Sequence, residues 1–309
     1  MKILFAWTGL TRCAGDCWRA LAALPGAEPK IVFDAPRDEA TAKTVFHSLD
    51  YSWADDPLPA GWRPDVLFAV GWHSRAVRSL VERADWKDVP KVFCFDMPWR
   101  ARPRCVAARF VLRRYLKRFR AAYVPGESAR FYASWLGFKR IEEGFLAMDT
   151  RRFAAAARAP WSARKGFLYV GRDAPEKRVD AIRAAHALYR SLGGSWEIEL
   201  HHETPYAGLP AVYARSACLV LASAHDPWPL VALEAKAAGC EVILSSRCAD
   251  RYELEARVVR YGNVRALARE MLAVERCGVP PRPQDLDLWD CRNWAERTLA
   301  LAKEVSCAD

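Results

Sequence analysis

The sequence lacks the features of a membrane-spanning or exported chain. No run of about 18 or more apolar residues occurs, so we expect no spanning helix. The start also lacks the length and small-residue exit of a signal peptide, because Met1–Trp7 is a strand-like run. With 52% hydrophobic and 27% charged residues, the composition is globular, which excludes wholesale disorder and collagen-like repeats. We therefore expect a cytoplasmic protein.

Metal-ligand spacings are missing as well. None of the ten cysteines belongs to a Cys-x-x-Cys pair, and the closest two are Cys13 and Cys17. The six histidines contain no His-x-x-x-His spacing. Because a zinc-finger type of site needs paired ligands at short spacing, the sequence favours reduced structural thiols. We expect no metal and no other cofactor.

Short apolar runs alternate with helix-length segments along all 309 residues, a length that suits two domains. The runs predicted as buried strands are Lys2–Trp7, Lys30–Phe33, Val66–Val70, Lys91–Phe95, Ala121–Val124, Phe167–Val170, Trp196–Leu200, Cys218–Leu221 and Val242–Leu244. Such alternation indicates parallel sheets covered by helices on both faces. We predict two α/β domains, residues 1–155 and 160–285. A C-terminal helical segment, residues 286–309, either caps the second domain or crosses back to the first.

The loop after the predicted strand Phe167–Val170 carries the first candidate site. Gly171 ends the strand, Arg172 follows, and Lys177 stands at the start of a predicted helix. Arginine presents a planar fork to phosphate oxygens, lysine adds a point charge, and glycine lets a phosphate approach the backbone. The pattern indicates a site that binds a diphosphate, here called the diphosphate cradle and formed by Gly171, Arg172 and Lys177. The alternative is an ordinary strand–turn–helix whose charged side chains are only solvated.

Two carboxylates follow the predicted strand Cys218–Leu221. Asp226 lies in the loop that opens the next helix, and Glu234 lies inside that helix, about a turn from its start. Both side chains are placed to reach one ligand across the helix N-terminus. Carboxylates there can accept paired hydrogen bonds from sugar hydroxyls.

These two stretches together resemble the second domain of retaining GT-B glycosyltransferases, the E-x7-E or glycosyl transferases group 1 family. That family carries a V-G-R-x-x-x-x-K loop and, further along, an E-x7-E signature running into L-E-A-x-A-x-G-x-P-V-I. The matching residues are Val170-Gly171-Arg172 with Lys177, and then Asp226 through Glu234 to Ile243. The resemblance implies two Rossmann-like domains facing across a cleft. It also implies a nucleotide-sugar donor, retention of configuration and no metal.

The resemblance assigns roles to residues of the second domain. Arg172 and Lys177 would hold the donor diphosphate against Gly171 and stabilise the leaving nucleotide. Glu234 would hold the ribose, and Asp226 would face the hydroxyls of the donor sugar.

The sequence departs from the family pattern in the first half of the signature. Asp226-Pro227-Trp228-Pro229-Leu230 stands where the family has E-G-F-G-L. Pro229 and Leu230 would therefore line the donor pocket where a glycine and a leucine usually do. Because proline has no backbone N–H, donors for the sugar and phosphate are lost. We expect a reshaped donor pocket.

The first domain resembles its family counterpart more weakly. Gly9, in a segment from Thr8 to Asp16, stands where the family keeps a flexible glycine loop under the donor phosphates. His73 follows a predicted strand, where many relatives place a histidine near the sugar. The resemblance places Gly9 in donor binding and His73 among the catalytic residues. A structural histidine is the alternative for His73.

One stretch lacks acidic residues altogether: residues 97–126 contain nine arginines and lysines and no carboxylate. Arg109, Arg113, Arg114, Lys117 and Arg118 form its centre, on a predicted helix Val106–Arg120 with interleaved aromatic residues. Unrelieved like charge repels itself unless an anion is near. The stretch therefore suits an anionic acceptor or membrane surface, or nucleic acid with bases stacked on the aromatic rings. A plainly solvated helix face is the third interpretation.

The sequence thus predicts an enzyme, a hexosyl-type glycosyltransferase that uses a nucleotide-diphosphate-sugar. The predicted acceptor is a cell-envelope glycan or a lipid-linked saccharide, reached by a cytoplasmic protein that is peripheral on the membrane. One alternative is a glycosyltransferase that modifies nucleic acid. Another is a degenerate GT-B protein that binds nucleotide-sugars without transferring them.

Overall fold

The computed structural model describes residues 1–10, 12–158, 160–202, 204–248 and 253–307 of the chain. The chain divides into two compact units. The first unit is Met1–Asp149 together with Leu288–Asp309, and the second is Thr150–Asp287. The C-terminal segment that follows Asp287 therefore belongs to the first unit.

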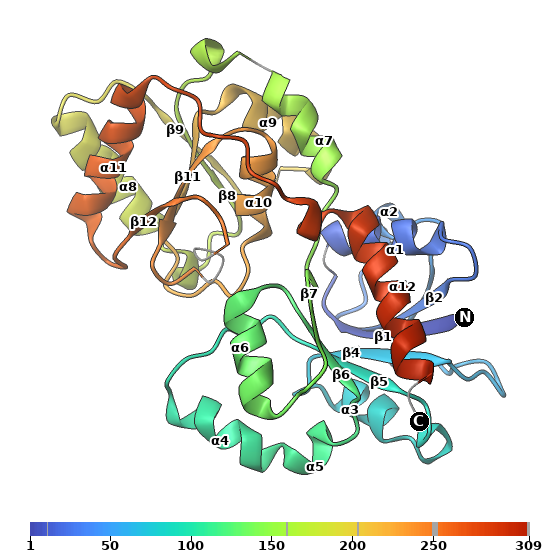
Figure 1. Cartoon of the computed structure of the whole chain (residues 1–309). Helices are drawn as coiled ribbons and strands as arrows, with labels where there is room; N and C mark the ends of the chain where they lie inside the picture. The colour runs from blue at the N-terminus through green and yellow to red at the C-terminus, as the bar shows by residue number, and fades with distance from the viewer. Residues whose placement is uncertain (11, 159, 203, 249–252, 308–309) are drawn as a thin grey trace. The chain divides into compact units, whose positions relative to one another are not determined.

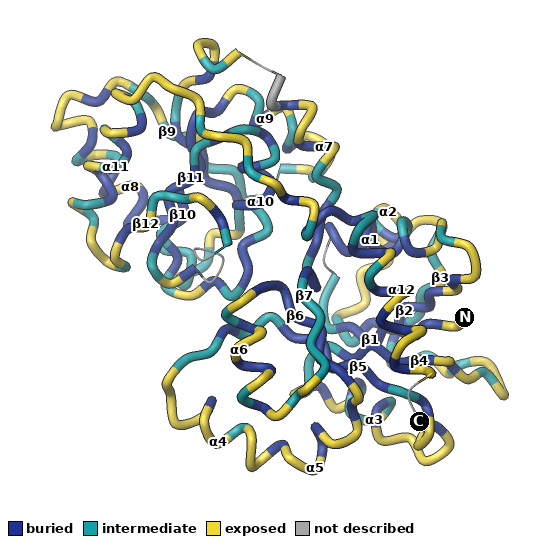
Figure 2. The backbone as a smooth tube through the Cα atoms, in the orientation of Figure 1, coloured by how far each residue is buried: buried dark blue, intermediate teal, exposed yellow. Residues whose placement is uncertain are grey.

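The first unit is built on a parallel sheet with the strand order β3-β2-β1-β4-β5-β6-β7 (Figure 1). Its strands are β1 Lys2–Thr8, β2 Glu28–Asp34, β3 Asp50–Trp53, β4 Val66–Val70, β5 Lys91–Cys94, β6 Ala121–Val124 and β7 Ile141–Glu143. Its helices are α1 Arg12–Ala22, α2 Glu39–Val45, α3 Arg75–Glu82, α4 Pro103–Val111, α5 Arg113–Leu116, α6 Glu127–Leu136 and α12 Cys291–Cys307. The central strands β1, β4, β5 and β6 are almost entirely buried (Figure 2).

The order of this sheet reverses between β1 and β4, which pair in parallel register from Ile3 with Val66 to Ala6 with Ala69. In doubly wound sheets, ligands bind beside such a reversal, at the carboxyl ends of the strands. Gly71, just past β4, has φ +82°, and a Cβ on it would lie 2.4 Å from a side-chain carbon of Thr8. The two strand ends therefore meet closely.

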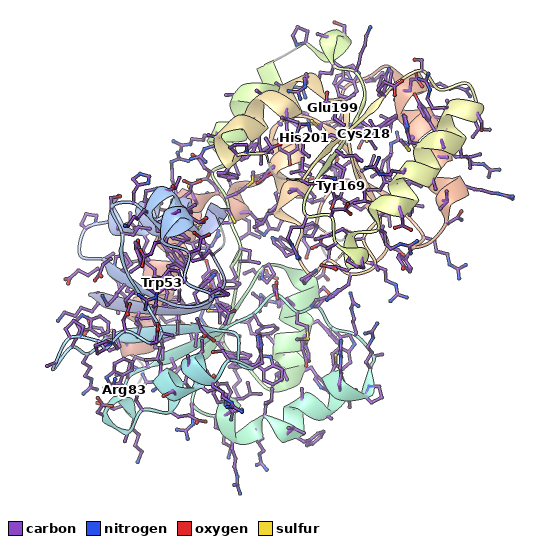
Figure 3. The ribbon with its side chains drawn as sticks, turned by 180° about the vertical axis from the view of Figure 1, so that it is seen from behind. Trp53, Arg83, Tyr169, Glu199, His201 and Cys218 are labelled. Carbon is purple, nitrogen blue, oxygen red and sulfur yellow. The ribbon has the colours of Figure 1, made fainter. Side chains whose placement is uncertain are left out.

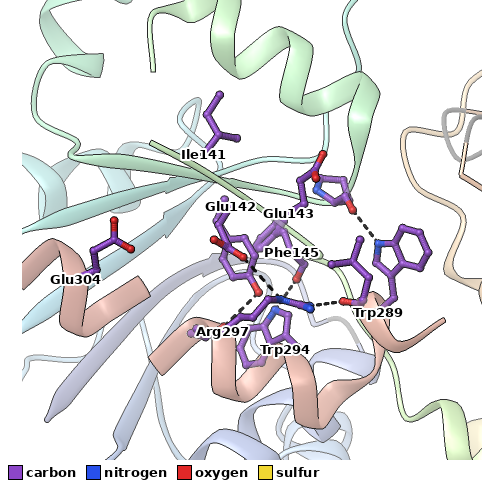
Figure 4. Close-up of polar contacts among 12 residues, drawn as sticks. Ile141, Glu142, Glu143, Phe145, Trp289, Trp294, Arg297 and Glu304 are labelled. Carbon is purple, nitrogen blue, oxygen red and sulfur yellow. Dashed lines mark hydrogen bonds and ion pairs between the residues drawn. The ribbon is translucent and has the colours of Figure 1, made fainter. Parts of the chain in front are cut away.

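Helix α12 packs into the first unit through two buried tryptophans (Figure 4). The indole N–H of Trp294 donates to the backbone oxygen of Phe145 at 2.7 Å, and that of Trp289, just before the helix, donates to Pro125 at 2.8 Å. The ring of Trp294 also stacks on Tyr123. These contacts explain why the C-terminal segment returns to the first sheet.

The second unit is built on a smaller parallel sheet with the strand order β12-β11-β10-β8-β9. Its strands are β8 Phe167–Val170, β9 Ile198–His201, β10 Cys218–Leu221, β11 Glu241–Ser245 and β12 Arg257–Val259. Its helices are α7 Thr150–Ala154, α8 Val179–Ser191, α9 Leu209–Arg215, α10 Leu230–Ala237 and α11 Val264–Cys277. Here the order reverses between β8 and β10, so the loops after these two strands lie beside each other at the carboxyl edge.

The predicted fold class is confirmed, since both units are parallel sheets with helices. The interior strands lie where the apolar runs predict them. The edge strands β3, β7 and β12 have no counterpart in the prediction, because each is short and only partly buried.

Edge strand β9 is shifted from the predicted Trp196–Leu200 to Ile198–His201. Its polar residues Glu199 and His201 (Figure 3) are hydrogen-bonded at 2.9 Å, and Arg215 forms an ion pair with the same carboxylate at 2.6 Å. Hydrogen bonding from Arg215 lowers the pKa of Glu199 to about 2. The polar character of the strand explains why its apolar pattern is weak.

Two further predictions about helices are wrong. The single helix expected over Val106–Arg120 is broken into α4 and α5 at Leu112, whose backbone, with φ −90° and ψ 1°, is not helical. The apolar pattern of Val179, Ile182, Leu188 and Leu192 predicts that all four face inward in the helix after Lys177, but Leu192, just past the end of α8, is 44% exposed. None of the helices in the described part of the chain is long and apolar enough to cross a membrane.

Candidate functional site

An ion pair joins two of the predicted site residues at the carboxyl edge of the second sheet. Lys177 Nζ lies 2.5 Å from Asp226 Oδ2, with the lysine side chain 21% exposed and the aspartate 7%. Lys177 follows β8 and Asp226 follows β10, the neighbouring strands at which the order reverses. The backbone N–H of Ala224 donates to the oxygen of Glu176 at 2.7 Å, which ties the two loops together.

Arg172 lies beside this pair in sequence but remains open to solvent. Its side chain is 76% exposed and meets Glu176 at 3.1 Å. The preceding Gly171 has φ +147°, and a Cβ there would lie 3.0 Å from the hydroxyl of Tyr169. That hydroxyl donates to the backbone oxygen of Arg172 at 2.8 Å. The loop backbone is thus fixed, while the solvent-exposed guanidinium would have to leave Glu176 to bind an anion.

A second basic cluster, which the sequence reasoning missed, adjoins Lys177. Arg178 adopts the left-handed conformation, with φ +54°, and its guanidinium donates to Asp180 and to the hydroxyl of Tyr261. The guanidiniums of Arg178 and Arg247 lie 5.8 and 5.5 Å from the centre of the Tyr261 ring. Arg178 directly follows the Lys177 of the motif, but only the fold brings Arg247 and Tyr261 to it.

Glu234 is the fifth residue of α10, as the sequence places it, but its carboxylate is turned inward. The residue is 3% exposed, and Tyr213 donates a hydrogen bond to Glu234 Oε2 at 2.8 Å. Burial raises the pKa of Glu234 to about 7. Tyr213 comes from α9, and nothing in the sequence pattern pairs it with Glu234. The ribose-binding role of Glu234 stays a prediction.

The proline segment between the two carboxylates packs inward. Trp228 and Pro229 are buried, and Pro229 directly precedes α10, whose first residue is Leu230. Asp226 forms a β-bridge with Cys248, with its backbone N–H donating to Arg247 at 3.4 Å. The segment therefore has a fixed backbone in place of the mobile glycines of the family pattern.

In the first unit, Gly9 and His73 both follow strands at the reversal point. Gly9 has φ +91°, and a Cβ on it would meet nothing within 4 Å. His73 is exposed and lies edge-on to Trp72, with the ring centres 6.1 Å apart. Ser74, the next residue, caps α3 by accepting a hydrogen bond from Val77 at 3.0 Å. His73 is thus held at a helix entrance with its ring in solvent, and its catalytic role stays a prediction.

Gly15 does not belong to a flexible loop, contrary to the expectation from the sequence. It lies inside α1, where a Cβ would come within 2.7 Å of the backbone oxygen of Val45 at the end of α2. We expect Gly15→Ala to lower the free energy of unfolding by about 1–3 kcal/mol, as overpacking does in tight contacts. Denaturant unfolding measures this. Gly208→Ala, whose nearest neighbour would be 3.7 Å away, is the control and should cost less than Gly15→Ala.

The basic residues of the first unit lie apart from Gly9 and His73. Arg109 is on α4, Arg113 and Arg114 are on α5, and Lys117 and Arg118 follow it; all five are exposed. Because α4 and α5 connect the carboxyl end of β5 to the amino end of β6, this stretch leads away from the carboxyl edge. The interleaved Tyr115 and Phe119 are buried in the core.

One group of side chains in the first unit has the geometry of metal ligands. Ligand atoms of Asp149, Asp290 and Cys291 lie within 4.8 Å of one another. Arg292 already meets both carboxylates, at 3.5 and 3.3 Å, and burial raises the pKa of Cys291 to about 12. A protonated thiol and a resident guanidinium do not suit a cation.

Part of the chain matches a known protein family. The family model for glycosyl transferases group 1 matches residues 183–282, which include Asp226 and Glu234. No curated protein sequence matches the chain significantly.

Solved structures resemble the chain over nearly its whole length, though at low sequence identity. A glycosyltransferase from Rickettsia africae has a TM-score of 0.72 at 10% identity, covering 100% of this chain and 99% of that one. The lipopolysaccharide outer core galactosyltransferase WaaB has 0.63 at 13%, covering 98% and 100%. HepE from Anabaena, in complex with UDP and glucose, has 0.63 at 12%, covering 99% and 97%.

The motif residues, the two parallel sheets and the family match agree with one another. The structural likenesses share the fold, and the matched residues 183–282 lie within the second unit, where Lys177 pairs with Asp226. Residues 183–282 of the second unit therefore match the glycosyl transferases group 1 family, and the chain as a whole has the GT-B fold.

Proposed function

We propose that the protein transfers a hexose from a nucleotide-diphosphate-sugar to an acceptor with retention of configuration. The observation that carries this proposal is the Lys177–Asp226 ion pair between the loops that follow β8 and β10. A lysine and an exposed arginine at that edge offer two cations to a diphosphate. The UDP and glucose bound to HepE, which has a similar fold, suggest UDP-glucose as the first donor to test.

The ion pair suggests how the donor would be gripped. When a diphosphate arrives, Lys177 turns from Asp226 to the phosphate oxygens, and Arg172 joins it from the solvent side. Asp226 then has its carboxylate available for a hydroxyl of the sugar. As the bond to the sugar breaks, the two cations stabilise the negative charge that develops on the leaving nucleotide. No side chain here is assigned as a nucleophile.

The proposed acceptor is a cell-envelope glycan or a lipid-linked saccharide. Nucleic acid is a poorer candidate, because two of the interleaved rings, Tyr115 and Phe119, are only 5% and 8% exposed, although Phe110 is 69% exposed. Stacking on bases needs open aromatic faces. Binding without transfer is the second candidate function, favoured by the fixed Asp226-Pro-Trp-Pro segment.

Calorimetric titration with nucleosides carrying one or two phosphates tests the donor site. We expect a nucleoside diphosphate, with UDP tried first, to bind about 10–100-fold more tightly than its monophosphate, since a charge-assisted hydrogen bond contributes about 1.5–3 kcal/mol. Equal affinities, or no binding by any nucleoside diphosphate, would contradict the diphosphate cradle. Release of the sugar from a panel of nucleotide-sugars then separates an enzyme from a protein that only binds.

A further inference from the structure

A basic groove of about 590 Å³ lies in the first unit, lined by α4, α5 and the segment after α6. Its basic lining residues are Arg109, Arg113, Lys117, Arg120 and Lys139. Apolar side chains such as Leu116 and Phe138 complete the wall, and none of the lining residues is acidic. The groove therefore combines concentrated positive charge with apolar walls.

The groove opens at the amino edge of the first sheet. Arg120 directly precedes β6, and its backbone N–H donates to the oxygen of Lys91, the first residue of β5, at 2.9 Å. Lys139 lies just before β7. Gly9 and His73 lie at the opposite, carboxyl edge of the same sheet. A ligand in this groove is therefore outside the proposed reaction site of this unit.

Several of these cations form no ion pair with a carboxylate among the residues that the structure describes. Arg109 donates to the backbone oxygen of Trp135 at 3.1 Å, a contact that does not neutralise its charge. No ion pair is recorded for Arg113, Lys117 or Lys139 within the part of the chain that the structure describes. Exposed cations this close to one another favour an anionic surface.

The same face carries exposed apolar side chains. Phe110 is 69% exposed and Val111 is 77% exposed, both at the end of α4 and close in sequence to Arg113. Large apolar side chains next to a row of cations are typical of helices that lie in the interface of an anionic membrane. Phe110 alone could stack on a base, whereas Val111 has no ring and Tyr115 and Phe119 are buried, so the surface suits a membrane better than nucleic acid.

We propose that this amino edge docks on an anionic phospholipid bilayer. Arg113, Lys117 and Lys139 contact the lipid phosphates, and Phe110 and Val111 insert at the boundary of the acyl chains. This docking does not depend on the proposed transfer reaction, since it uses no residue of the Lys177–Asp226 site.

Sedimentation of the full chain with vesicles tests the charged half of the surface. We expect binding to phosphatidylcholine vesicles that contain phosphatidylglycerol, little binding to phosphatidylcholine alone, and weaker binding as salt rises. Arg113→Gln with Lys117→Gln should weaken partitioning about 25-fold, at about 5-fold for each cation near the surface. The control is Arg265→Gln with Arg269→Gln, at two exposed positions of α11. This double variant removes the same net charge at the same sequence spacing, and it should bind the vesicles normally.

A second pair of variants tests the exposed apolar residues of the proposed membrane-docking surface. Phe110→Ser with Val111→Ser should weaken vesicle binding at every salt concentration, whereas Val279→Ser, at an exposed valine of the second unit, should not. Equal binding to neutral and anionic vesicles would overturn the proposal, as would unchanged binding by both variants. Binding to short DNA without binding to vesicles, lost in the charge variant, would identify a nucleic-acid surface instead. Nucleoside diphosphate titration of the same variants reports on the donor site separately.

Discussion

Replacing Lys177 with alanine is expected to lower the rate of sugar transfer by about 10²–10³-fold. That is the typical loss when one preorganised group that stabilises developing charge is removed. Lys177 stands at the carboxyl edge of the second sheet, 2.5 Å from Asp226, and is the least exposed cation of the proposed diphosphate cradle. Because Lys177 would contact the donor phosphates both on binding and in the transition state, its loss should lower kcat and also weaken donor binding. Initial rates over a range of donor concentrations separate kcat from KM.

The same substitution also affects stability, because it leaves the buried Asp226 without its partner. Breaking a buried ion pair costs about 3–5 kcal/mol. Lys177→Ala combined with Asp226→Asn removes both charges, so it should recover most of the stability and none of the activity. Lys165→Ala, at an exposed lysine of the same unit, is the matched control and should transfer normally. Full activity in Lys177→Ala would show that the leaving diphosphate is stabilised elsewhere.

Glu234 is expected to make the stability of the second unit fall as pH rises from about 4.5 to about 7. Burial raises the pKa of the folded carboxyl to about 7, against an ordinary value of 4.5. Between these values the unfolded chain loses its proton while the folded chain keeps it, so raising the pH favours unfolding. The total effect is about 3 kcal/mol as an upper bound, fully developed above the folded pKa.

A Glu234→Gln variant lacks this titration, so its stability relative to the native chain should rise over the same pH window. Unfolding by urea at a series of pH values measures the difference. Tyr213→Phe removes the hydrogen bond that lowers the pKa of Glu234, and should therefore extend the window to higher pH. Glu255→Gln, at an exposed glutamate of the same unit, is the control. A pH-independent difference between Glu234→Gln and the native chain would mean that Glu234 is ionised throughout the window.

The interior of each sheet was predictable from the sequence, whereas the edges were not. β4, β6, β8 and β10 are continuous apolar runs because both of their faces are covered, and they begin and end where those runs do. β3, with the sequence DYSW, and β7, with IEE, are short edge strands that are mostly not buried. Their place in the sheet is decided by pairing with β2 and β6, which local patterns do not report.

In the candidate site, too, some features were predictable from the sequence and others were not. The motif predicted Arg172, Lys177, Asp226 and Glu234 as a group, and it placed Glu234 correctly within a helix. It did not show that Tyr213 would turn the Glu234 carboxylate inward, nor that Arg247 would reach Tyr261 next to Arg178. Those contacts join elements far apart in the chain, and only packing brings them together.

The sequence by itself determined the family motif, the buried strands and the excess of positive charge in residues 97–126. These depend on residue type and local spacing, which the chain carries without folding. Only the tertiary structure decided that the reversal between β8 and β10 sets Lys177 against Asp226. It alone also placed Arg113, Lys117 and Lys139 at the amino edge of the first sheet, opposite Gly9 and His73. In a parallel sheet, the segment after one strand must return to the amino edge before the next strand can begin. The basic stretch leaves the carboxyl end of β5 and reaches the amino end of β6, so its later residues lie far from the carboxyl edge.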